Sequence, residues 1–121
     1  VVFQTKLSGG LPNLVSASPN ETIGEALKRL EEFNISQLPV IDENKSLGSL
    51  TEADIMSRII ENPAIIEKKV SDLMDKPYPV IDESDDMKHG IQNLKKSPAI
   101  LVSQYGRIIG ILTRIDVLDF V

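Results

Sequence analysis

Apolar residues recur at helical spacing in two separate parts of the chain. In the first half they include Ile23, Leu27 and Leu30, with Phe33 on the same side. Charged residues occupy most of the other positions, which is typical of an amphipathic helix with one buried face. The spacing predicts a helix of about four turns that begins after the polar segment 18–22.

Two short, largely apolar runs follow this helix, and a polar turn of hairpin length separates them. We predict strands at residues 37–41 and 47–50, because short apolar runs bounded by turn signals are typical of strands. The second run ends at Thr51, after which apolar residues return at helical spacing. Asn62-Pro63 is expected to stop that second helix.

The same order of elements returns in the second half of the chain. A polar segment at residues 84–86 is predicted to start a helix, and strands are predicted at residues 98–102 and 108–112. Brief apolar segments at Leu14-Val15 and Val80-Ile81 precede the two helices. The chain therefore contains two units of the order βαββα, which indicates an internal duplication.

The two copies differ in one connection. Gly48 and Gly110 are displaced by 62 residues, whereas the helix starts at Ile23 and Met87 are displaced by 64. The second copy is therefore two residues shorter between its helix and its hairpin. Because units this small bury little surface alone, we expect an α/β (α+β) fold in which two tandem βαββα repeats pack around a pseudo-twofold axis.

The duplication also predicts the boundaries of the domains. Residues 1–12 are interpreted as a linker or the end of a preceding domain, residues 13–66 as the first repeat and residues 77–121 as the second. Residues 67–76 form a charged connector that is expected to contain a short helix near Val70.

Composition narrows the classes of function. The 121 residues are 41% hydrophobic and only 4% aromatic, so the core is expected to be mostly aliphatic. A net charge of −5 argues against nucleic acid as a partner, because such binding requires many Lys and Arg residues. The absence of Cys excludes disulfides and thiolate chemistry. No apolar run has the roughly 20 residues that cross a membrane, and we expect a cytoplasmic protein without membrane contact.

A short motif ends the hairpin of each copy. Residues 48–54 and 110–116 both read Gly, two residues, Thr, two residues, Asp. Thr-x-x-Asp at the start of a helix is the spacing of a capping box, in which Thr and Asp satisfy backbone N–H groups without any ligand. The same residues could instead serve an adenosine nucleotide, since a helix N-terminus suits phosphate and a carboxylate can accept hydrogen bonds from ribose hydroxyls.

These features resemble the CBS domain, two copies of which pair as a Bateman module. The resemblance is carried by Leu38-Pro39-Val40-Ile41-Asp42, by the Gly-x-x-Thr-x-x-Asp motif in both copies and by the connector around residues 70–74, and it covers nearly all of residues 13–121. Residues 110–121 with residues 34–39 are also similar to the C-terminal regulatory region of a bacterial-type cystathionine β-synthase.

The resemblance implies two pockets for an adenosyl ligand. In the family the Asp binds ribose, the Thr or Ser lies beside the phosphate, and adenine lies between apolar backbone of the other copy. One pocket would comprise Thr113, Ile115, Asp116, Leu14, Val15, Ile35, Gln37 and Leu38. The other would comprise Thr51, Ala53, Asp54, Tyr78, Val80, Ala99 and Ile100.

The first of these pockets is expected to bind the ligand better. Arg114 would favour an anionic ligand beside Asp116, whereas Glu52 at the equivalent position would disfavour one. Pro77 and Pro79 also stiffen the strand that borders the second pocket. The alternative interpretation of Arg114 is a side chain that points into solvent.

No set of residues in this chain predicts catalysis or metal binding. His89 is the single histidine and lies in a polar stretch, so we expect it on the surface. Acidic clusters such as Asp85-Asp86 lack the spacing of a calcium loop and are interpreted as turns or helix starts. No nucleophile has an evident base beside it. The chain itself is therefore not expected to be an enzyme, and no metal or cofactor is expected in it.

The resulting hypothesis is a regulatory module that senses AMP, ADP, ATP or S-adenosylmethionine and modulates an attached enzyme. The resemblance implies that this enzyme is a pyridoxal-phosphate-dependent, cystathionine β-synthase-like lyase N-terminal to the chain, where the pyridoxal phosphate would be bound. The apolar face Ile55, Met56, Ile59 and Ile60 suggests ordinary packing or a homodimer interface. The rival functions are a ligand-free dimerisation module and an independent small enzyme.

Overall fold

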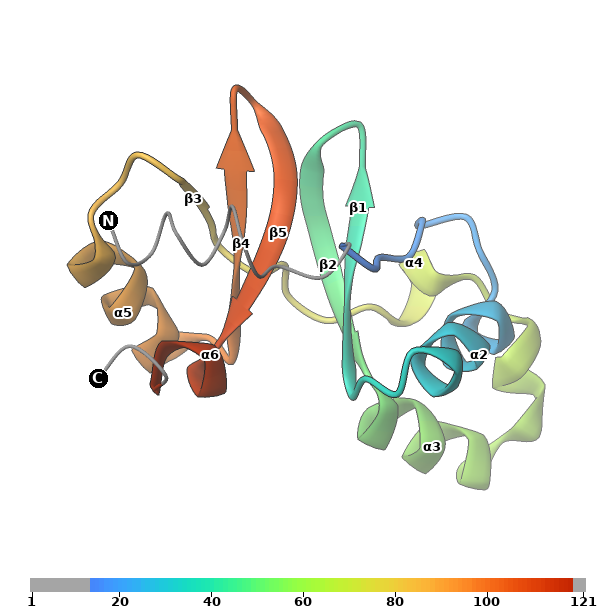
Figure 1. The fold of residues 1–121 in the computed structure, drawn as a ribbon. Helices are drawn as coiled ribbons and strands as arrows, with labels where there is room; N and C mark the ends of the chain where they lie inside the picture. Colours follow the sequence, from blue (N-terminus) through green and yellow to red (C-terminus); the bar gives the residue numbers. More distant parts are fainter. Residues whose placement is uncertain (1–13, 119–121) are drawn as a thin grey trace. The chain divides into compact units, whose positions relative to one another are not determined.

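The structure is a computed structural model that describes residues 14–118, with a few side chains excepted. The chain folds into two compact units, which we describe separately (Figure 1). We refer to residues 15–77 as the first repeat and to residues 78–118 as the second repeat, with Leu14 grouped with the second. Both combine helices with strands, as an α+β fold requires.

The first repeat contains one hairpin and several helices. In chain order its elements are α2 (Ile23–Glu32), β1 (Gln37–Asp42), β2 (Lys45–Thr51), α3 (Glu52–Glu61), the 3₁₀ helix η1 (Pro63–Glu67) and α4 (Val70–Leu73). The predicted stop at Asn62-Pro63 is confirmed, since Asn62 is the C-cap of α3 and its side chain accepts a hydrogen bond from Ala64 N–H.

Helix α2 is shorter than its pattern predicted. Thr22 caps its start by accepting a hydrogen bond from the Glu25 N–H, and ten residues give about three turns instead of four. Phe33 is the C-cap residue and 52% exposed, so the prediction that it lies on the apolar side of the helix is wrong. The helix ends there because Asn34 adopts a left-handed conformation, with φ of 53°.

The predicted hairpin turns are confirmed in both repeats. Glu43 and Asn44 have positive φ between β1 and β2, and Tyr105 and Gly106 have positive φ at the equivalent place in the second hairpin. Positive φ at both central residues is the type I′ turn, whose twist matches that of the flanking strands. All four hairpin strands extend further toward their turn than predicted, because the hydrogen-bonded ladder continues into the polar residues there. The strand predicted at residues 98–102 begins one residue later, at Ala99.

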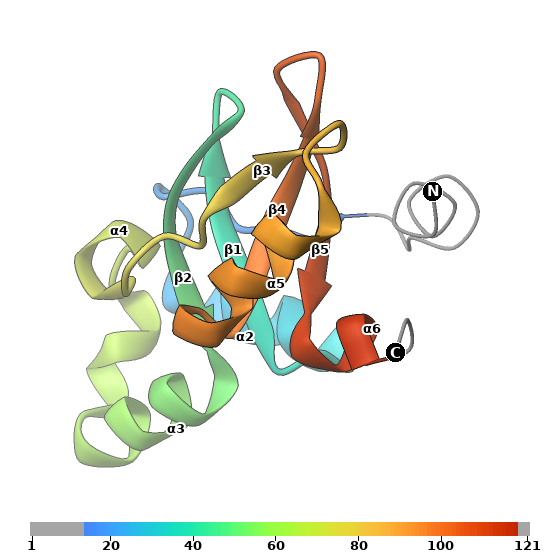
Figure 2. The ribbon, with the colours of Figure 1, turned by 90° about the vertical axis from the view of Figure 1, so that its left-hand side faces the viewer.

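The second repeat has a three-stranded sheet. Its elements are β3 (Val80–Asp82), α5 (Met87–Lys96), β4 (Ala99–Gln104), β5 (Arg107–Thr113) and α6 (Arg114–Leu118). Strand β4 is central, parallel to β3 and antiparallel to β5 (Figure 2). The brief apolar segment Val80-Ile81 therefore forms the predicted strand.

The equivalent segment of the first repeat does not form a strand. Leu14-Val15 lies in irregular chain, and only Ala17 makes an isolated parallel bridge, to Val40. The expected first strand is thus reduced to two hydrogen bonds, from Ala17 N–H to the Pro39 carbonyl and from Ile41 N–H to the Ala17 carbonyl. The turn at Pro19 follows at once, and proline has no N–H with which to extend the ladder.

Each repeat buries its own aliphatic core on the side of the sheet where its helices lie. The first core contains Ala17, Ile23, Ala26, Leu30, Leu38, Val40, Leu50, Ile55 and Val70. The second contains Ile81, Leu94, Ile100, Val102 and Leu112 among the residues described. The apolar stripe that predicted α2 is therefore the stripe that packs, with the exception of Phe33.

The connector, residues 67–76, packs onto the rest of the first repeat. Its predicted short helix is α4, and Val70 within it is fully buried. The Lys68 carbonyl accepts from Ile23 N–H at 2.8 Å, and Asp75 forms an isolated bridge with Ser49 of β2. Gly48 allows this close approach, because a Cβ there would lie 2.9 Å from the Asp75 carbonyl oxygen. Within residues 14–118, no helix is long and apolar enough to span a membrane.

Candidate functional site

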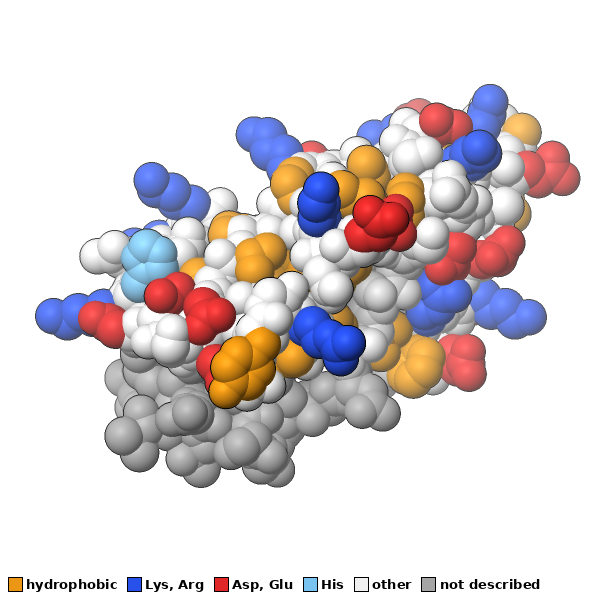
Figure 3. Space-filling view, turned by 90° about the horizontal axis from the view of Figure 1, so that it is seen from above, with side chains coloured by type: hydrophobic (Ala, Val, Ile, Leu, Met, Phe, Trp, Pro, Cys, Tyr) orange, Lys and Arg blue, Asp and Glu red, His pale blue; other side chains and the backbone are white. Residues whose placement is uncertain are grey.

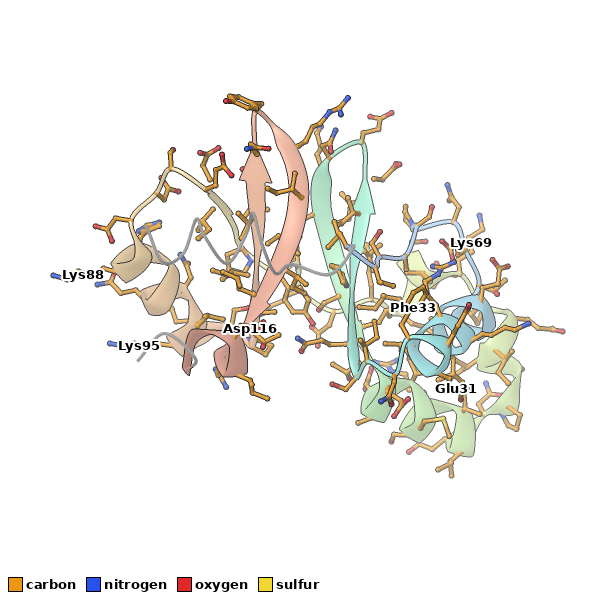
Figure 4. All side chains as sticks on the ribbon, in the orientation of Figure 1. Glu31, Phe33, Lys69, Lys88, Lys95 and Asp116 are labelled. Atoms are coloured by element: carbon orange, nitrogen blue, oxygen red, sulfur yellow. The ribbon has the colours of Figure 1, made fainter. Side chains whose placement is uncertain are left out.

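The strand-to-helix junction of the second repeat forms a complete capping box. The Asp116 carboxylate oxygen Oδ2 accepts hydrogen bonds from Thr113 N–H at 2.9 Å and from the Thr113 hydroxyl at 3.1 Å. In return, Thr113 Oγ1 accepts from Asp116 N–H at 3.4 Å. Both residues are half-buried where β5 passes into α6 (Figure 4). These bonds hold the carboxylate in one orientation.

The same motif in the first repeat forms only half of that box. Thr51 Oγ1 accepts from Asp54 N–H at 3.2 Å, which caps α3. The Asp54 carboxylate, however, pairs with Arg58 Nε at 3.0 Å, one turn further along the exposed face of the helix. The residue 62 positions after Arg58 is Phe120, which cannot form such a pair. Spacing of four between Asp and Arg on a helix is the sequence signal that our prediction missed.

Arg114 closes the end of a neighbouring helix. Its Nε donates a hydrogen bond of 2.8 Å to the Leu94 carbonyl in the last turn of α5. In the first repeat the equivalent carbonyl, that of Leu30, accepts from Ile35 N–H at 3.0 Å. The second repeat lacks a counterpart of Ile35, because it is two residues shorter between helix and hairpin. One donor of Arg114 therefore replaces a backbone group that the shorter connection has lost.

The first set of predicted adenine contacts belongs to the first repeat, with the exception of Leu14. Val15, Ile35 and Gln37 are half-buried, as is Leu14. Leu38 is fully buried in the core, so only its backbone can reach a ligand.

Two ion-paired residues fix the segment that carries Val15. Arg29 Nη1 donates to the Ser16 carbonyl at 2.9 Å and lies 2.8 Å from Glu21 Oε2. Glu21 Oε1 accepts from Ser18 N–H at 3.0 Å. Helical spacing does not predict this network, because Glu21 lies eight positions before Arg29 and outside α2.

The second set of predicted contacts is more deeply buried. Ala99 and Ile100 are fully buried and Tyr78 is 4% exposed, whereas Val80 is 44% exposed. Thr51, Ala53 and Asp54, which were assigned to the same pocket, are exposed at the start of α3. Ile115 of the first pocket is also exposed, at 73%.

Within each repeat the structure brings together residues that were assigned to different pockets. Gln37 is the cross-strand partner of Thr51, and Ala99 is the partner of Thr113. Each predicted pocket takes its residues from both compact units. His89, which was expected on the surface, is exposed on α5 (Figure 3).

Comparison with known proteins identifies the repeats. The family model of the CBS domain matches residues 11–61 and again residues 70–121. An inosine-5'-monophosphate dehydrogenase of Methanocaldococcus jannaschii is 32% identical over 89% of this chain, which spans 22% of that protein. A cystathionine beta-synthase of Dictyostelium discoideum is 28% identical over 91% of this chain, which spans 23% of that protein. The chain thus spans under a quarter of the length of these two relatives.

Solved structures share the same pair of repeats. The CBS-domain containing protein ATU1752 from Agrobacterium tumefaciens has a TM-score of 0.77 at 24% identity, and the match covers 98% of this chain and 97% of that one. The CBS-pair protein CBSX2 from Arabidopsis thaliana has a TM-score of 0.74 at 25% identity, covering 91% and 89%. Both repeats match the family model and the fold is that of CBS-pair proteins, so this chain is a tandem CBS pair, a regulatory module that belongs to the CBS domain family.

Proposed function

We propose that this CBS pair binds an adenosyl ligand at Thr113 and Asp116 and thereby modulates an attached enzyme. The observation that carries the proposal is the state of the Asp116 carboxylate. Its Oδ2 is held by Thr113, while no hydrogen bond to Oδ1 is found among the described residues. A half-buried carboxylate with one fixed and one open oxygen suits the paired hydroxyls of a ribose, which donate hydrogen bonds to it.

The equivalent carboxylate of the first repeat is less suited to this role. Asp54 is exposed and already paired with Arg58, so a ribose would have to compete with water and with that cation. We therefore propose a single principal site, with Ile115 beside the Thr113–Asp116 pair and with adenine against Leu14, Val15, Ile35, Gln37 and Leu38. The site with Thr51, Ala53, Asp54, Tyr78, Val80, Ala99 and Ile100 is proposed as the weaker one.

Arg114 has fewer donors available for a ligand than an unbound guanidinium has, because one of them already serves a backbone carbonyl. Its Nε donates to the Leu94 carbonyl, and no hydrogen bond from its terminal nitrogens is found within residues 14–118. A guanidinium fixed in this way still favours a phosphate over a neutral ligand. AMP, ADP and ATP fit this feature, whereas S-adenosylmethionine fits the resemblance to cystathionine β-synthase.

Regulation would follow from unequal affinity of the ligand for two arrangements of the module. A ligand shifts such an equilibrium only as far as it binds one arrangement more tightly than the other. We propose that the attached enzyme is a pyridoxal-phosphate-dependent, cystathionine β-synthase-like lyase. A dehydrogenase is the other class that the relatives support, since one of them is an inosine-5'-monophosphate dehydrogenase.

The module is also proposed to form a homodimer. Of the apolar face predicted on α3, Ile55 is 2% exposed and Ile59 packs against the core, so these two serve ordinary packing. Met56 is 40% exposed and Ile60 is 79% exposed on the same helix. Burial of such side chains in a second copy would supply apolar contact area.

A thermal-shift titration with S-adenosylmethionine, AMP, ADP and ATP tests the ligand proposal. A ligand present at a hundredfold excess over its dissociation constant should raise the free energy of unfolding by about 2.7 kcal/mol. Asp116→Asn should weaken that ligand about 10- to 100-fold, because it removes the charged acceptor but keeps an oxygen for the cap. Asp54→Asn is the matched control and should change affinity little. If none of the four ligands raises the unfolding temperature, the ligand proposal fails.

The completeness of the second capping box supports one other function, a ligand-free dimerisation module. In that case Thr113 and Asp116 serve only to start α6, which they do without any ligand. Asp116→Ala would then lower stability by about 1 kcal/mol and leave every ligand titration flat.

A further inference from the structure

The outer faces of two equivalent helices carry opposite charges. Helices α2 and α5 have the same length, ten residues each, and occupy equivalent places in the two repeats. Glu31 and Glu32 near the end of α2 correspond to Lys95 and Lys96 near the end of α5, each displaced by 64 residues. All four side chains are exposed, and Figure 4 labels Glu31 on α2 and Lys95 on α5.

The inversion extends beyond this pair. Glu25 on α2 corresponds to His89 on α5, and Gly24 corresponds to the exposed Lys88. Two positions run against the trend, since Lys28 and the half-buried Arg29 on α2 correspond to the neutral Gln92 and Asn93. The face of α2 that contains Glu25, Glu31 and Glu32 is therefore acidic on balance, and the face of α5 that contains Lys88, Lys95 and Lys96 is basic.

These charges have no ion-pair partner within the part of the chain that the structure describes. The ion pairs found there are Glu21 with Arg29 and Asp54 with Arg58. A solvated surface explains charges of either sign, but it gives no reason for the sign to invert at equivalent positions of a duplicated helix. Complementary faces on one molecule can be satisfied by a second copy, which presents the same two faces.

We propose that the acidic face of α2 in one copy docks against the basic face of α5 in a second copy. In a twofold-symmetric dimer this contact occurs twice, and Glu31 and Glu32 meet the partner's Lys95 and Lys96 each time. The opposite arrangement, α2 against α2 and α5 against α5, would bring like charges together. The inference rests on the homodimer proposed above and adds which faces meet.

Apolar and charged side chains have separate roles in this contact. Phe33 is 52% exposed directly after Glu32 and would be covered by the partner helix, which adds apolar contact area to that of α3. Exposed ion pairs contribute little affinity but exclude arrangements in which like charges face each other. The charges of α2 and α5 thus select the orientation of the dimer, and their effect decreases as salt rises.

Charge reversal measured by sedimentation equilibrium tests the docking of α2 on α5. The variants Glu31→Lys/Glu32→Lys and Lys95→Glu/Lys96→Glu should each raise the dimer dissociation constant about tenfold at low salt, since attraction becomes repulsion. The variant that combines all four changes should return to within about threefold of the unchanged chain. Lys68→Glu/Lys69→Glu is the control for the second variant, because it makes the same change of charge as Lys95→Glu/Lys96→Glu at exposed positions outside both faces.

Cross-linking provides a second, geometric measurement. The chain has no Cys, and Lys28 and Gln92 are equivalent exposed positions in the middle of the two helices. A mixture of Lys28→Cys and Gln92→Cys chains should form mainly the mixed disulfide, since a disulfide requires Cα atoms within about 7 Å. Disulfides between two identical variants would instead show that like helices meet.

The outcomes separate this inference from the function on which it rests. A chain that stays monomeric overturns the proposed homodimer and this contact together. If the dimer dissociation constant is unchanged by the charge reversals, only the pairing of α2 with α5 is overturned. The same conclusion follows if the variant with all four changes dimerises no more tightly than either double variant. The ligand titration is independent of both results.

Discussion

The two repeats share a backbone plan but stabilise it with different side chains. The hairpins match in register, with Gln37 opposite Thr51 and Ala99 opposite Thr113, and the strand irregularity falls at equivalent places, after Val40 and after Val102. The segments that enter and leave the helices differ in almost every polar contact. Duplication thus preserved the hairpin, whose contacts are mainly backbone, and left the junctions free to diverge.

Three junctions show this divergence. The turn before α2 is held by Glu21 and Arg29, whereas Asp85 and Asn93 stand at the equivalent positions of the second repeat. The end of α5 is closed by Arg114 and the end of α2 by backbone alone. The motif carboxylates differ too, since Asp116 turns back to Thr113 and Asp54 turns forward to Arg58. The proposed preference for one ligand site follows from this last difference.

The largest effect on the free energy of unfolding is expected at core positions that are alike in the two repeats. Leu30→Ala and Leu94→Ala remove equivalent side chains that are 0% and 5% exposed, and each should lower the free energy of unfolding by about 2–5 kcal/mol. The two losses should agree within about 1 kcal/mol, because the cavities lie at the same place in the two cores. Urea unfolding followed by circular dichroism measures both. A small loss at only one position would show that the cores are not equivalent.

The next effect should be confined to the first repeat. Arg29→Asn introduces the residue found at the equivalent position of the second repeat and removes hydrogen bonds to the Ser16 carbonyl and to Glu21. It should lower stability by about 1–2 kcal/mol, since both side chains are largely shielded from water. The reciprocal Asn93→Arg should stay within about 0.5 kcal/mol. Equal losses would contradict a network specific to the first repeat.

A smaller effect is expected at the end of α5. Arg114→Met keeps the aliphatic length but leaves the Leu94 carbonyl without its donor, which should lower stability by about 1 kcal/mol. Hydrogen exchange of the last turn of α5 should rise with it. Glu52→Gln, the control at the equivalent position, should leave both measurements unchanged. If Arg114→Met is neutral, the shorter connection does not depend on this cap.

The smallest effect is a titration. Hydrogen bonds from the Ser84 side chain and backbone N–H lower the pKa of the Asp82 carboxyl below its ordinary value. Because the folded pKa is lowered, this contribution to stability is present above the ordinary carboxyl pKa and is lost as the pH falls through the folded value. Ser84→Ala should raise the pKa of Asp82, as carbon NMR can measure. The residue of the first repeat that is equivalent to Asp82 is Ser18, which has no carboxylate to titrate.

Much of the fold could be predicted because local patterns and packing agree. The stripe from Ile23 to Leu30, the turns at residues 43–44 and 105–106, and the stop at Asn62-Pro63 each depend on neighbours in sequence. The wrong predictions also have local causes, but the pattern of apolar residues does not reveal them. Phe33 fits the apolar stripe, but a left-handed residue ends the helix before it can pack. Leu14-Val15 is apolar, but the turn at Pro19 leaves room for a single bridge.

The residues of the candidate site could be predicted from the sequence, but the hydrogen bonds and ion pairs that they form could not. The motif located Thr113 and Asp116 from spacing alone, and capping explained that spacing without a ligand. Whether Asp54 and Asp116 hold the same conformation depended on what else each carboxylate could reach. Arg58 lies one turn along α3 and reaches the first, while the second has Thr113 as its partner.

The duplication, the turns and, apart from the first strand of the first repeat, the order of elements could be predicted from the chain alone, because they depend on periodicity and on short-range backbone preferences. The packing of the connector on β2 and the carbonyl that Arg114 caps were seen first in the folded structure. It also showed that Asp116 keeps one oxygen without a described hydrogen bond, whereas Asp54 is paired. Those outcomes depend on contacts between residues far apart in the chain, or on a choice between two nearby partners. The distance between the side chains in space decides them, and the spacing of residues in the sequence does not give that distance.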